Sequence, residues 1–154
     1  MAMTSDERVR EALEKDLTID ITTTGRRSGR PSRKEIWFHN LDGRIYITGS
    51  PGPRDWYANL VAQPEFTFHL KQSVTADVPA RARAITDEVE KRRVMALILE
   101  HLKRVGDPGQ SRDLDEWVAR SPLVEVTFPE SVGWAAGEVL WVEPFSVGLP
   151  PNGA

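Results

Sequence analysis

The residues best suited to chemistry in this sequence form a basic segment between Gly25 and Lys34. The segment carries five positive side chains and no acid, in a chain of 154 residues whose formal net charge is -3. Guanidinium groups and the backbone N–H groups of glycine-containing turns both bind phosphate or carboxylate oxygens. The segment therefore predicts a site for a multiply charged anion. A solvated, charged turn without any ligand fits the same pattern.

The sequence on either side of the basic segment predicts two strands joined by a turn. Alternating apolar residues over 17–22 indicate a half-buried strand that ends at Gly25, and residues 34–39 form the returning strand. Neighbouring residues of a strand face opposite sides, so Trp37 and Phe38 cannot both line one site. Ile36 and Phe38 continue the other face, and we therefore assign Trp37 to the site.

The rest of the chain predicts a small α+β barrel. A long helix over 86–105 carries an apolar stripe, and Asp42-Gly43 marks a hairpin turn. The other predicted elements are helices over 6–15, 54–61 and 113–119, and strands over 44–48, 65–70, 74–84 and 123–128. The predicted stripe consists of Val94, Leu97, Ile98, Leu102 and Val105. Antiparallel strands with one long helix before the last strand are typical of such barrels.

Composition excludes several classes of function. The chain contains no cysteine, which rules out disulfides, thiolate ligands and a thiol nucleophile. Its pI near 5.7 argues against general nucleic-acid binding, so the local basic segment favours a small anionic ligand. No apolar run approaches the roughly 20 residues that span a bilayer. The N-terminus lacks the apolar core of a secretory signal, and we expect a cytoplasmic protein.

Other catalytic signals are weak. His39, His69 and His101 lack metal-ligand spacing and are interpreted as surface or strand positions. The sequence shows no Ser-His-Asp pattern, P-loop or dinucleotide fingerprint. Hydride transfer would not require any of them, because the cofactor carries that chemistry.

Residues 1–128 are predicted to form one domain, with an N-terminal helix, and residues 129–154 a C-terminal extension. We expect a strand over 139–142 in this extension and disorder at its end. Four of its residues are too apolar to leave in water: Trp134, Trp141, Val142 and Phe145. Covering them predicts a homodimer, unless the extension packs on its own barrel or over a cofactor site.

Several motifs together resemble the deazaflavin-dependent nitroreductase family. They are TTTGRRSGRP over 22–31, Trp37-Phe38, Asp42-Gly43-Arg44, DWYANL over 55–60, and Pro64. The family belongs to the split β-barrel flavin and deazaflavin oxidoreductases, which are distantly related to pyridoxamine-phosphate oxidases. The resemblance covers residues 17–86 well, and it implies a split β-barrel of about six mainly antiparallel strands with flanking helices.

The resemblance also implies a cofactor and the residues that line it. The cofactor is coenzyme F420, an 8-hydroxy-5-deazaflavin with a phosphodiester and a polyglutamate tail, and FMN is the alternative. The predicted cofactor-binding residues are Arg26, Arg27, Ser28, Ser32, Arg33, Lys34, Ile36, Trp37, Phe38, Thr48, Gly49, Ser50, Asp55, Trp56 and Tyr57. No catalytic side chain and no metal ligand is assigned.

The sequence departs from the family pattern at four places, one of which is Glu35, a carboxylate where many relatives are neutral. Residues 50–53 read SPGP where relatives often have a longer loop with Lys-Gly-Gly, and two prolines remove two N–H donors. Ser32 stands where an arginine is typical, and Arg33, one position later, faces the other side. The region 111–117 does not match the tyrosines of the nitroreductase, so nitroimidazole reduction is not expected.

The resulting functional prediction is an oxidoreductase that passes a hydride from the reduced coenzyme to a small apolar acceptor. A quinone, a nitro compound and an activated alkene all fit that description. Three alternatives remain open: an FMN-dependent enzyme of the same superfamily, a non-catalytic protein that carries the cofactor, and a barrel that has lost its cofactor.

Overall fold

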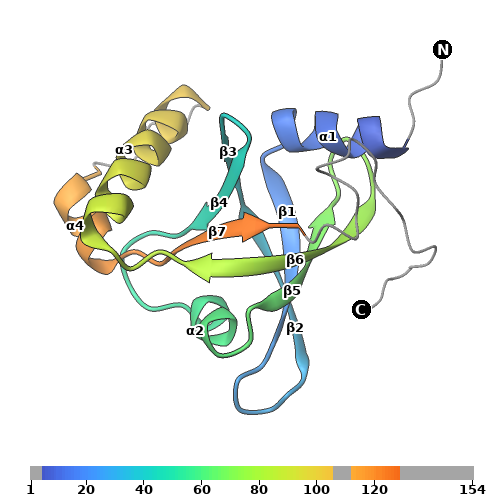
Figure 1. The fold of residues 1–154 in the computed structure, drawn as a ribbon, viewed down its shortest axis with the longest axis horizontal. Coiled ribbons are helices and arrows are strands. Elements are labelled where there is room, and N and C mark those ends of the chain that lie inside the picture. The colour runs from blue at the N-terminus through green and yellow to red at the C-terminus, as the bar shows by residue number, and fades with distance from the viewer. Residues whose placement is uncertain (1–4, 106–111, 129–154) are drawn as a thin grey trace.

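Seven antiparallel strands form one sheet that curls into a half-barrel, and helices lie against both of its faces (Figure 1). A computed structural model describes residues 5–105 and 112–128 of the chain. Its helices are α1 (Ser5–Lys15), α2 (Asp55–Ala62), α3 (Glu88–Arg104) and α4 (Leu114–Arg120). Its strands are β1 (Thr18–Thr24), β2 (Pro31–Trp37), β3 (His39–Leu41), β4 (Arg44–Thr48), β5 (Glu65–Leu70), β6 (Ala76–Ala84) and β7 (Leu123–Thr127). The predicted α+β split barrel is confirmed.

The sheet has one strand more than predicted, because the expected strand over 34–39 divides at Phe38. The strand order is β2-β1-β5-β6-β7-β4-β3, so the two edge strands are neighbours in sequence. The first half of the segment pairs with β1 and the second half with β4. Phe38 lies between them, and its N–H donates to the Leu17 carbonyl at 3.0 Å. One residue therefore joins the two edges of the sheet.

The main core lies inside the curled sheet. Ile19 and Ile21 of β1 pack there with Phe38 and Phe68, whose rings meet edge to face at 5.4 Å. One end of this core is covered by α1, through Val9, Ala12 and Leu13, and α2 adds Trp56 and Leu60. The alternation of apolar residues along β1 and β5 thus sets which sheet face is internal.

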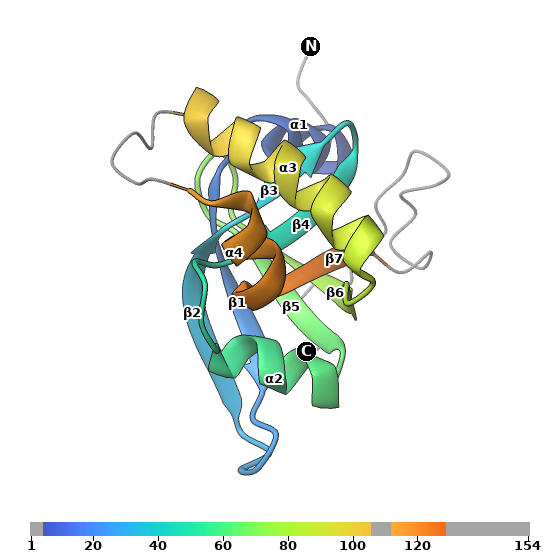
Figure 2. The ribbon, with the colours of Figure 1, turned by 90° about the vertical axis from the view of Figure 1, so that its left-hand side faces the viewer.

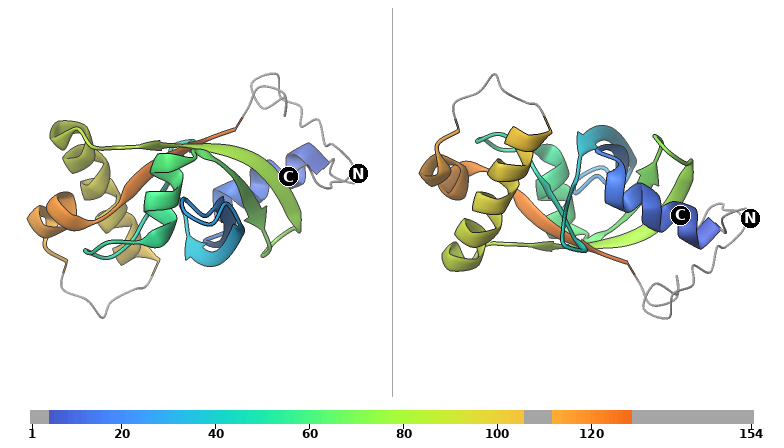
Figure 3. Two further views of the ribbon diagram at one scale, coloured as in Figure 1. Left: turned by 90° about the horizontal axis from the view of Figure 1, so that it is seen from below. Right: turned by 90° about the horizontal axis from the view of Figure 1, so that it is seen from above.

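A second core lies on the outer face of β4 and β7, beneath α3 and α4. Tyr46 and Leu123 project from the sheet into it, and the two helices lie together at the end of the molecule away from α1 (Figure 3). The helical side contributes Val94, Met95, Ile98, Leu102, Trp117 and Val118. The predicted stripe was partly wrong, because Leu97 is 47% exposed and Val105 38% exposed. Met95, adjacent to Val94 on the helix surface, is buried in their place.

Local signals explain where the elements begin and turn. Asp42 (φ 58°) and Gly43 (φ 92°) adopt the left-handed conformation of a tight hairpin, which confirms the predicted turn between β3 and β4. The Asp87 side chain accepts a hydrogen bond from the Glu90 N–H at 2.8 Å and caps α3. That cap places the start of α3 two residues after the predicted boundary.

The predictions for residues 129–154 fall outside the described residues. They are the domain boundary at 128, the strand over 139–142 and the homodimer through Trp134, Trp141, Val142 and Phe145. None of the helices in the described ranges combines the length and the apolar character that crossing a membrane requires.

Candidate functional site

The first part of the basic segment, residues 25–30, forms the tip of the β1–β2 hairpin, which projects beyond the rest of the molecule beside α2 (Figure 2), and residues 31–34 begin β2. Thr24 pairs with Pro31, so residues 25–30 form the loop. The Gly25 N–H donates to the Arg30 carbonyl at 2.8 Å, and the Gly29 N–H donates to the Gly25 carbonyl at 2.9 Å. Gly29 has a φ of +70°, which favours glycine at that position. The loop is therefore closed by its own backbone and exposes its cations.

One buried side chain anchors this loop to α2. The Asn59 side-chain oxygen accepts hydrogen bonds from the Arg26 N–H at 3.1 Å and from the Arg26 guanidinium at 2.9 Å. The Asn59 amide donates to the Thr23 hydroxyl at 3.1 Å. Arg26 also forms an ion pair with Asp55 at 3.4 Å. Arg26 is consequently held in place by the protein, and the other cations of the loop are not.

The remaining cations are available to a ligand. Arg27, Arg30 and Lys34 are exposed, and their side chains have no hydrogen-bond or ion-pair partner within the described part of the chain. The backbone N–H groups of Arg27 and Ser28 likewise have no partner among these residues. Exposed guanidinium, ammonium and turn N–H donors together suit a phosphate or a carboxylate. The donors present thus fit the anionic groups of coenzyme F420.

The faces of β2 divide the predicted site residues into two groups. Ser32, Lys34 and Ile36 pair with Thr23, Ile21 and Ile19, and so face the inner side of the sheet. Arg33 and Trp37 pair with Thr22 and Thr18 on the outer side. Arg33 donates to the Asp20 carboxylate there at 2.9 Å, and Trp37 is 37% exposed. Only the inner group lies on the sheet face that α2 covers.

Two predicted aromatic contacts are core residues. Phe38 and Trp56 are both buried in the main core. Tyr57, the next residue along α2, is half-buried and contacts Trp56 edge to face at a ring distance of 6.1 Å. Tyr57 is therefore the aromatic side chain of α2 that a ligand can reach.

The loop between β4 and α2 is organised around Arg54, which the sequence reasoning did not select. Its guanidinium lies so close to Gly49 and Gly52 that a Cβ at either would approach it to 3.4 and 3.3 Å respectively. The same guanidinium donates to the Pro53 carbonyl at 3.0 Å. Thr48 at the end of β4 is buried, and its hydroxyl donates to the Pro122 carbonyl at 2.6 Å. Ser50 is exposed in the same loop. Arg54 therefore supplies a cation in the loop from which Pro51 and Pro53 remove two N–H donors.

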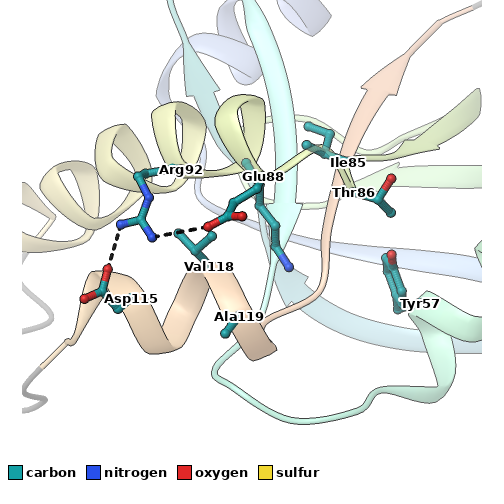
Figure 4. Close-up of a pocket in the computed structure, with 9 residues that line it drawn as sticks. Tyr57, Ile85, Thr86, Glu88, Arg92, Asp115, Val118 and Ala119 are labelled. Atoms are coloured by element: carbon teal, nitrogen blue, oxygen red, sulfur yellow. Dashed lines mark hydrogen bonds and ion pairs between the residues drawn. The ribbon is translucent and has the colours of Figure 1, made fainter.

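Two adjoining pockets lie on the other side of this loop and share Tyr57, Lys91 and Ala119. The first has a volume of about 400 Å³ and lies between α2, the end of β6, α3 and α4 (Figure 4). At its rim, Arg92 forms ion pairs with Glu88 at 3.9 Å and with Asp115 at 2.7 Å. The second, of about 330 Å³, is lined by residues 52–54, Tyr57, Ala58, Lys91 and 119–122. Tyr57 thus connects the predicted coenzyme site to both pockets.

Asn59 and Lys91 were missed although the sequence holds a signal for each. Asn59 is a polar residue three positions after Trp56 and next to Leu60, on the apolar face of α2. Lys91 lies three positions before Val94 and seven before Ile98, on the buried side of α3. A polar residue within an apolar helical face indicates a buried polar partner or a cavity.

Two of the three histidines are buried strand residues rather than surface residues. His39 contacts His101 through their Nδ1 atoms at 2.8 Å, and burial lowers the pKa of His39 to about 3. His69 contacts the Thr22 hydroxyl and the Asp77 carboxylate, each at 2.7 Å, on the outer sheet face. Burial lowers the pKa of His69 despite the opposing effect of Asp77. Within the described residues, no group of three metal-ligating side chains gathers.

Several solved structures share the fold of this chain. A structure named F420 reductase is 19% identical, with a TM-score of 0.60, and the match covers 78% of this chain and 92% of that chain. A conserved hypothetical protein from Mycobacterium tuberculosis is 18% identical, with a TM-score of 0.58 and coverages of 83% and 82%. The haem storage protein HutZ from Vibrio cholerae is 15% identical, with a TM-score of 0.59 and coverages of 82% and 92%. These likenesses establish the split-barrel fold, which serves more than one function.

The sequence itself identifies the family. Residues 1–108 match the family described as F420H(2)-dependent quinone reductase, and the chain belongs to that family. It is therefore an oxidoreductase that depends on coenzyme F420 and acts on a small molecule. The predicted resemblance to the deazaflavin-dependent enzymes is confirmed.

Proposed function

We propose that this protein reduces a quinone, and that it holds coenzyme F420 between the loop 25–30, the inner face of β2 and the start of α2. The single observation that carries the proposal is the set of donors without a partner, among the described residues, on the loop 25–30 and the adjoining part of β2. Arg27, Arg30 and Lys34 are free to bind a polyanion, whereas Arg26 is held by Asn59 and Asp55. When bound in its reduced form, the coenzyme supplies the hydride.

The residues of the chain act by binding, orienting and limiting water. The Arg27 and Lys34 cations attract the phosphate and carboxylate groups, and Arg26 keeps the loop next to α2. Ile36 extends the inner face of β2 toward the core, which favours an apolar ring over water at that point. Reduction of a quinone to the hydroquinone needs one hydride and one proton. The side chains of Glu88 and Asp115 at the rim of the pocket beside α3 and α4 are exposed, so solvent there is available as the source of the proton.

We propose that the acceptor binds in the pocket between α2, α3 and α4. Ile85, Val118 and Ala119 give it an apolar wall, and Tyr57 stands where that wall meets the predicted coenzyme site. The other side of the pocket is charged, through Glu88, Lys91, Arg92 and Asp115. An acceptor that combines a flat apolar ring with polar oxygens suits such a lining, and the family description names a quinone. A quinone is therefore the acceptor that we favour over a nitro compound or an alkene.

Titration of the purified protein with coenzyme F420 and with FMN tests the cofactor site. We expect tighter binding of coenzyme F420, because its tail carries more negative charge than a single phosphate. Arg27→Ala and Lys34→Ala should each weaken binding of the coenzyme by about 1–3 kcal/mol and reduce its dependence on salt. These two variants leave the Arg26–Asn59 anchor intact.

The matched control is Arg93→Ala, which removes an exposed arginine of α3. This helix and the tip of the β1–β2 hairpin lie at opposite ends of the molecule (Figure 2). The control variant makes the same change in net charge and should leave the dissociation constant unchanged. Equal affinity of the two hairpin variants and the wild type would show that the basic segment is only a solvated turn. Tighter binding of FMN than of coenzyme F420 would contradict the proposed cofactor.

A further inference from the structure

The second of the two pockets beside α2 has the charge of an anion site. Its lining includes the three cations Arg54, Lys91 and Arg120, and no aspartate or glutamate. We call it the cationic pocket. Such a concentration of one sign is unusual in a chain whose net charge is -3. Converging cations without a carboxylate in the lining suit a carboxylate, sulfonate or phosphate.

Lys91 is the least satisfied of these cations. It is half-buried on the inner side of α3, and its ammonium has no hydrogen-bond or ion-pair partner in the described ranges. Burial alone lowers its pKa, since no carboxylate opposes that effect. Arg120, by contrast, has the Glu116 carboxylate at 2.9 Å. A partly buried ammonium without a counter-charge is costly unless a ligand provides one.

A second observation points to the same place. Ser121 lines the cationic pocket, is 2% exposed, and its hydroxyl has no hydrogen-bond partner among the described residues. Buried hydroxyls are normally paired, so an unpaired one at a pocket wall suggests a missing acceptor. The position of Arg54 is defined as well, because it packs on Gly49 and Gly52 and donates to Pro53. The pocket is thus preorganised for an oxyanion.

The neighbouring pocket is where the ring of the acceptor is proposed to lie. The two pockets share Tyr57, Lys91 and Ala119, so an arm attached to that ring would enter the cationic pocket. In the ring pocket, Arg92 is engaged with Glu88 and Asp115. Lys91 is therefore the free cation at the common wall.

We propose that the acceptor is a quinone with an acidic substituent, and that Lys91, Arg54, Arg120 and Ser121 bind that substituent. The proposal rests on the proposed function for the location of the ring. It adds a specificity element: an acidic quinone binds in preference to a neutral quinone of the same size. The hydrogen-bond donors of the pocket discriminate by charge, whereas the apolar wall does not.

Calorimetric titration of the full chain without coenzyme tests this proposal apart from catalysis. The ligands are anthraquinone-2-sulfonate and its neutral analogue 2-(hydroxymethyl)anthraquinone. We expect the sulfonate to bind at least about tenfold more tightly. Lys91→Met should remove most of this preference, and Lys91→Arg should retain it. Lys103→Met, the same change at an exposed lysine of α3, serves as the control and should behave as the wild type.

Three results would overturn the proposal. They are equal affinity of the wild type for both ligands, an unchanged preference in Lys91→Met, and weaker binding of coenzyme F420 by Lys91→Met. The last result would assign the pocket to the tail of the coenzyme. Failure of the proposed function would look different, because then reduced coenzyme would not be oxidised by either quinone, whatever their affinities.

Discussion

Replacement of Asn59 by alanine should both destabilise the fold and weaken binding of the coenzyme. Asn59 is 5% exposed and makes three hydrogen bonds, two from Arg26 and one to the Thr23 hydroxyl. Loss of the buried Thr23 contact costs about 1 kcal/mol, and loss of the contacts to Arg26, which water partly replaces, about 1 kcal/mol more. We therefore expect the free energy of unfolding to fall by about 2 kcal/mol.

The effect on the coenzyme follows from the freedom that Arg26 gains. Without Asn59, the one polar side-chain contact left between Arg26 and α2 among the described residues is the 3.4 Å ion pair to the exposed Asp55. Surface ion pairs contribute little, so the loop must be ordered again when the coenzyme binds. About tenfold weaker binding, or 1.4 kcal/mol, is the expected result.

Thr23→Val separates the two effects. This variant removes the hydroxyl that Asn59 contacts but leaves Arg26 bound to Asn59. It should lose about 1 kcal/mol of stability and bind the coenzyme as the wild type does. Urea unfolding and fluorescence titration, at a temperature where every variant is folded, measure both quantities. If Thr23→Val weakened coenzyme binding as much as Asn59→Ala, or if Asn59→Ala were as stable as the wild type, this reasoning would be refuted.

Two further predictions concern buried ionisable side chains. Burial lowers the pKa of His39 to about 3 in the folded state, so below its ordinary pKa of roughly 6.5 the unfolded chain binds a proton that the folded chain does not. Stability should therefore decline as pH falls, by about 2 kcal/mol between pH 7.5 and 5, and His39→Asn should flatten the profile in urea titrations at each pH. Glu125 is buried and contacts Arg44 at 2.9 Å and Arg83 at 2.8 Å, so Glu125→Gln should cost about 1–2 kcal/mol in urea unfolding. Glu65→Gln, at an exposed pair with Arg81, should cost less than about 0.5 kcal/mol, and equal losses at the two positions would contradict the role of burial.

The elements that the sequence predicts well are those with a clear period and a clear end. The alternation of apolar residues predicts both ends of β5, Glu65 and Leu70, as the structure has them. The pair Asp42-Gly43 predicts the hairpin between β3 and β4. The division at Phe38 could not be predicted, because the pattern of a single strand does not reveal that its two halves pair with different partners. That information lies in the sheet order, which depends on strands far away in the sequence.

The candidate site could be predicted only where the sequence brings its residues together. The cations of the loop 25–30 are contiguous, and their exposure follows from the turn itself. Lys91, Arg54 and Ser121 meet because α3 and α4 fold over the outer sheet face, a contact between segments that no local pattern encodes. The DWYANL motif likewise does not reveal which of its two aromatic residues is buried. In the structure, Trp56 packs in the main core and Tyr57 lines the pockets.

The measurement that tests the central claim most directly is the oxidation of reduced coenzyme F420 by a quinone, followed through the absorbance of the oxidised coenzyme. Purified protein should catalyse this reaction with anthraquinone-2-sulfonate and, more slowly, with its neutral analogue. Arg27→Ala and Lys34→Ala should raise the KM for the coenzyme with little change in kcat, because both residues bind the coenzyme and neither touches the acceptor. Absence of any catalysed oxidation, or a full rate with FMN in place of the deazaflavin, would contradict the account.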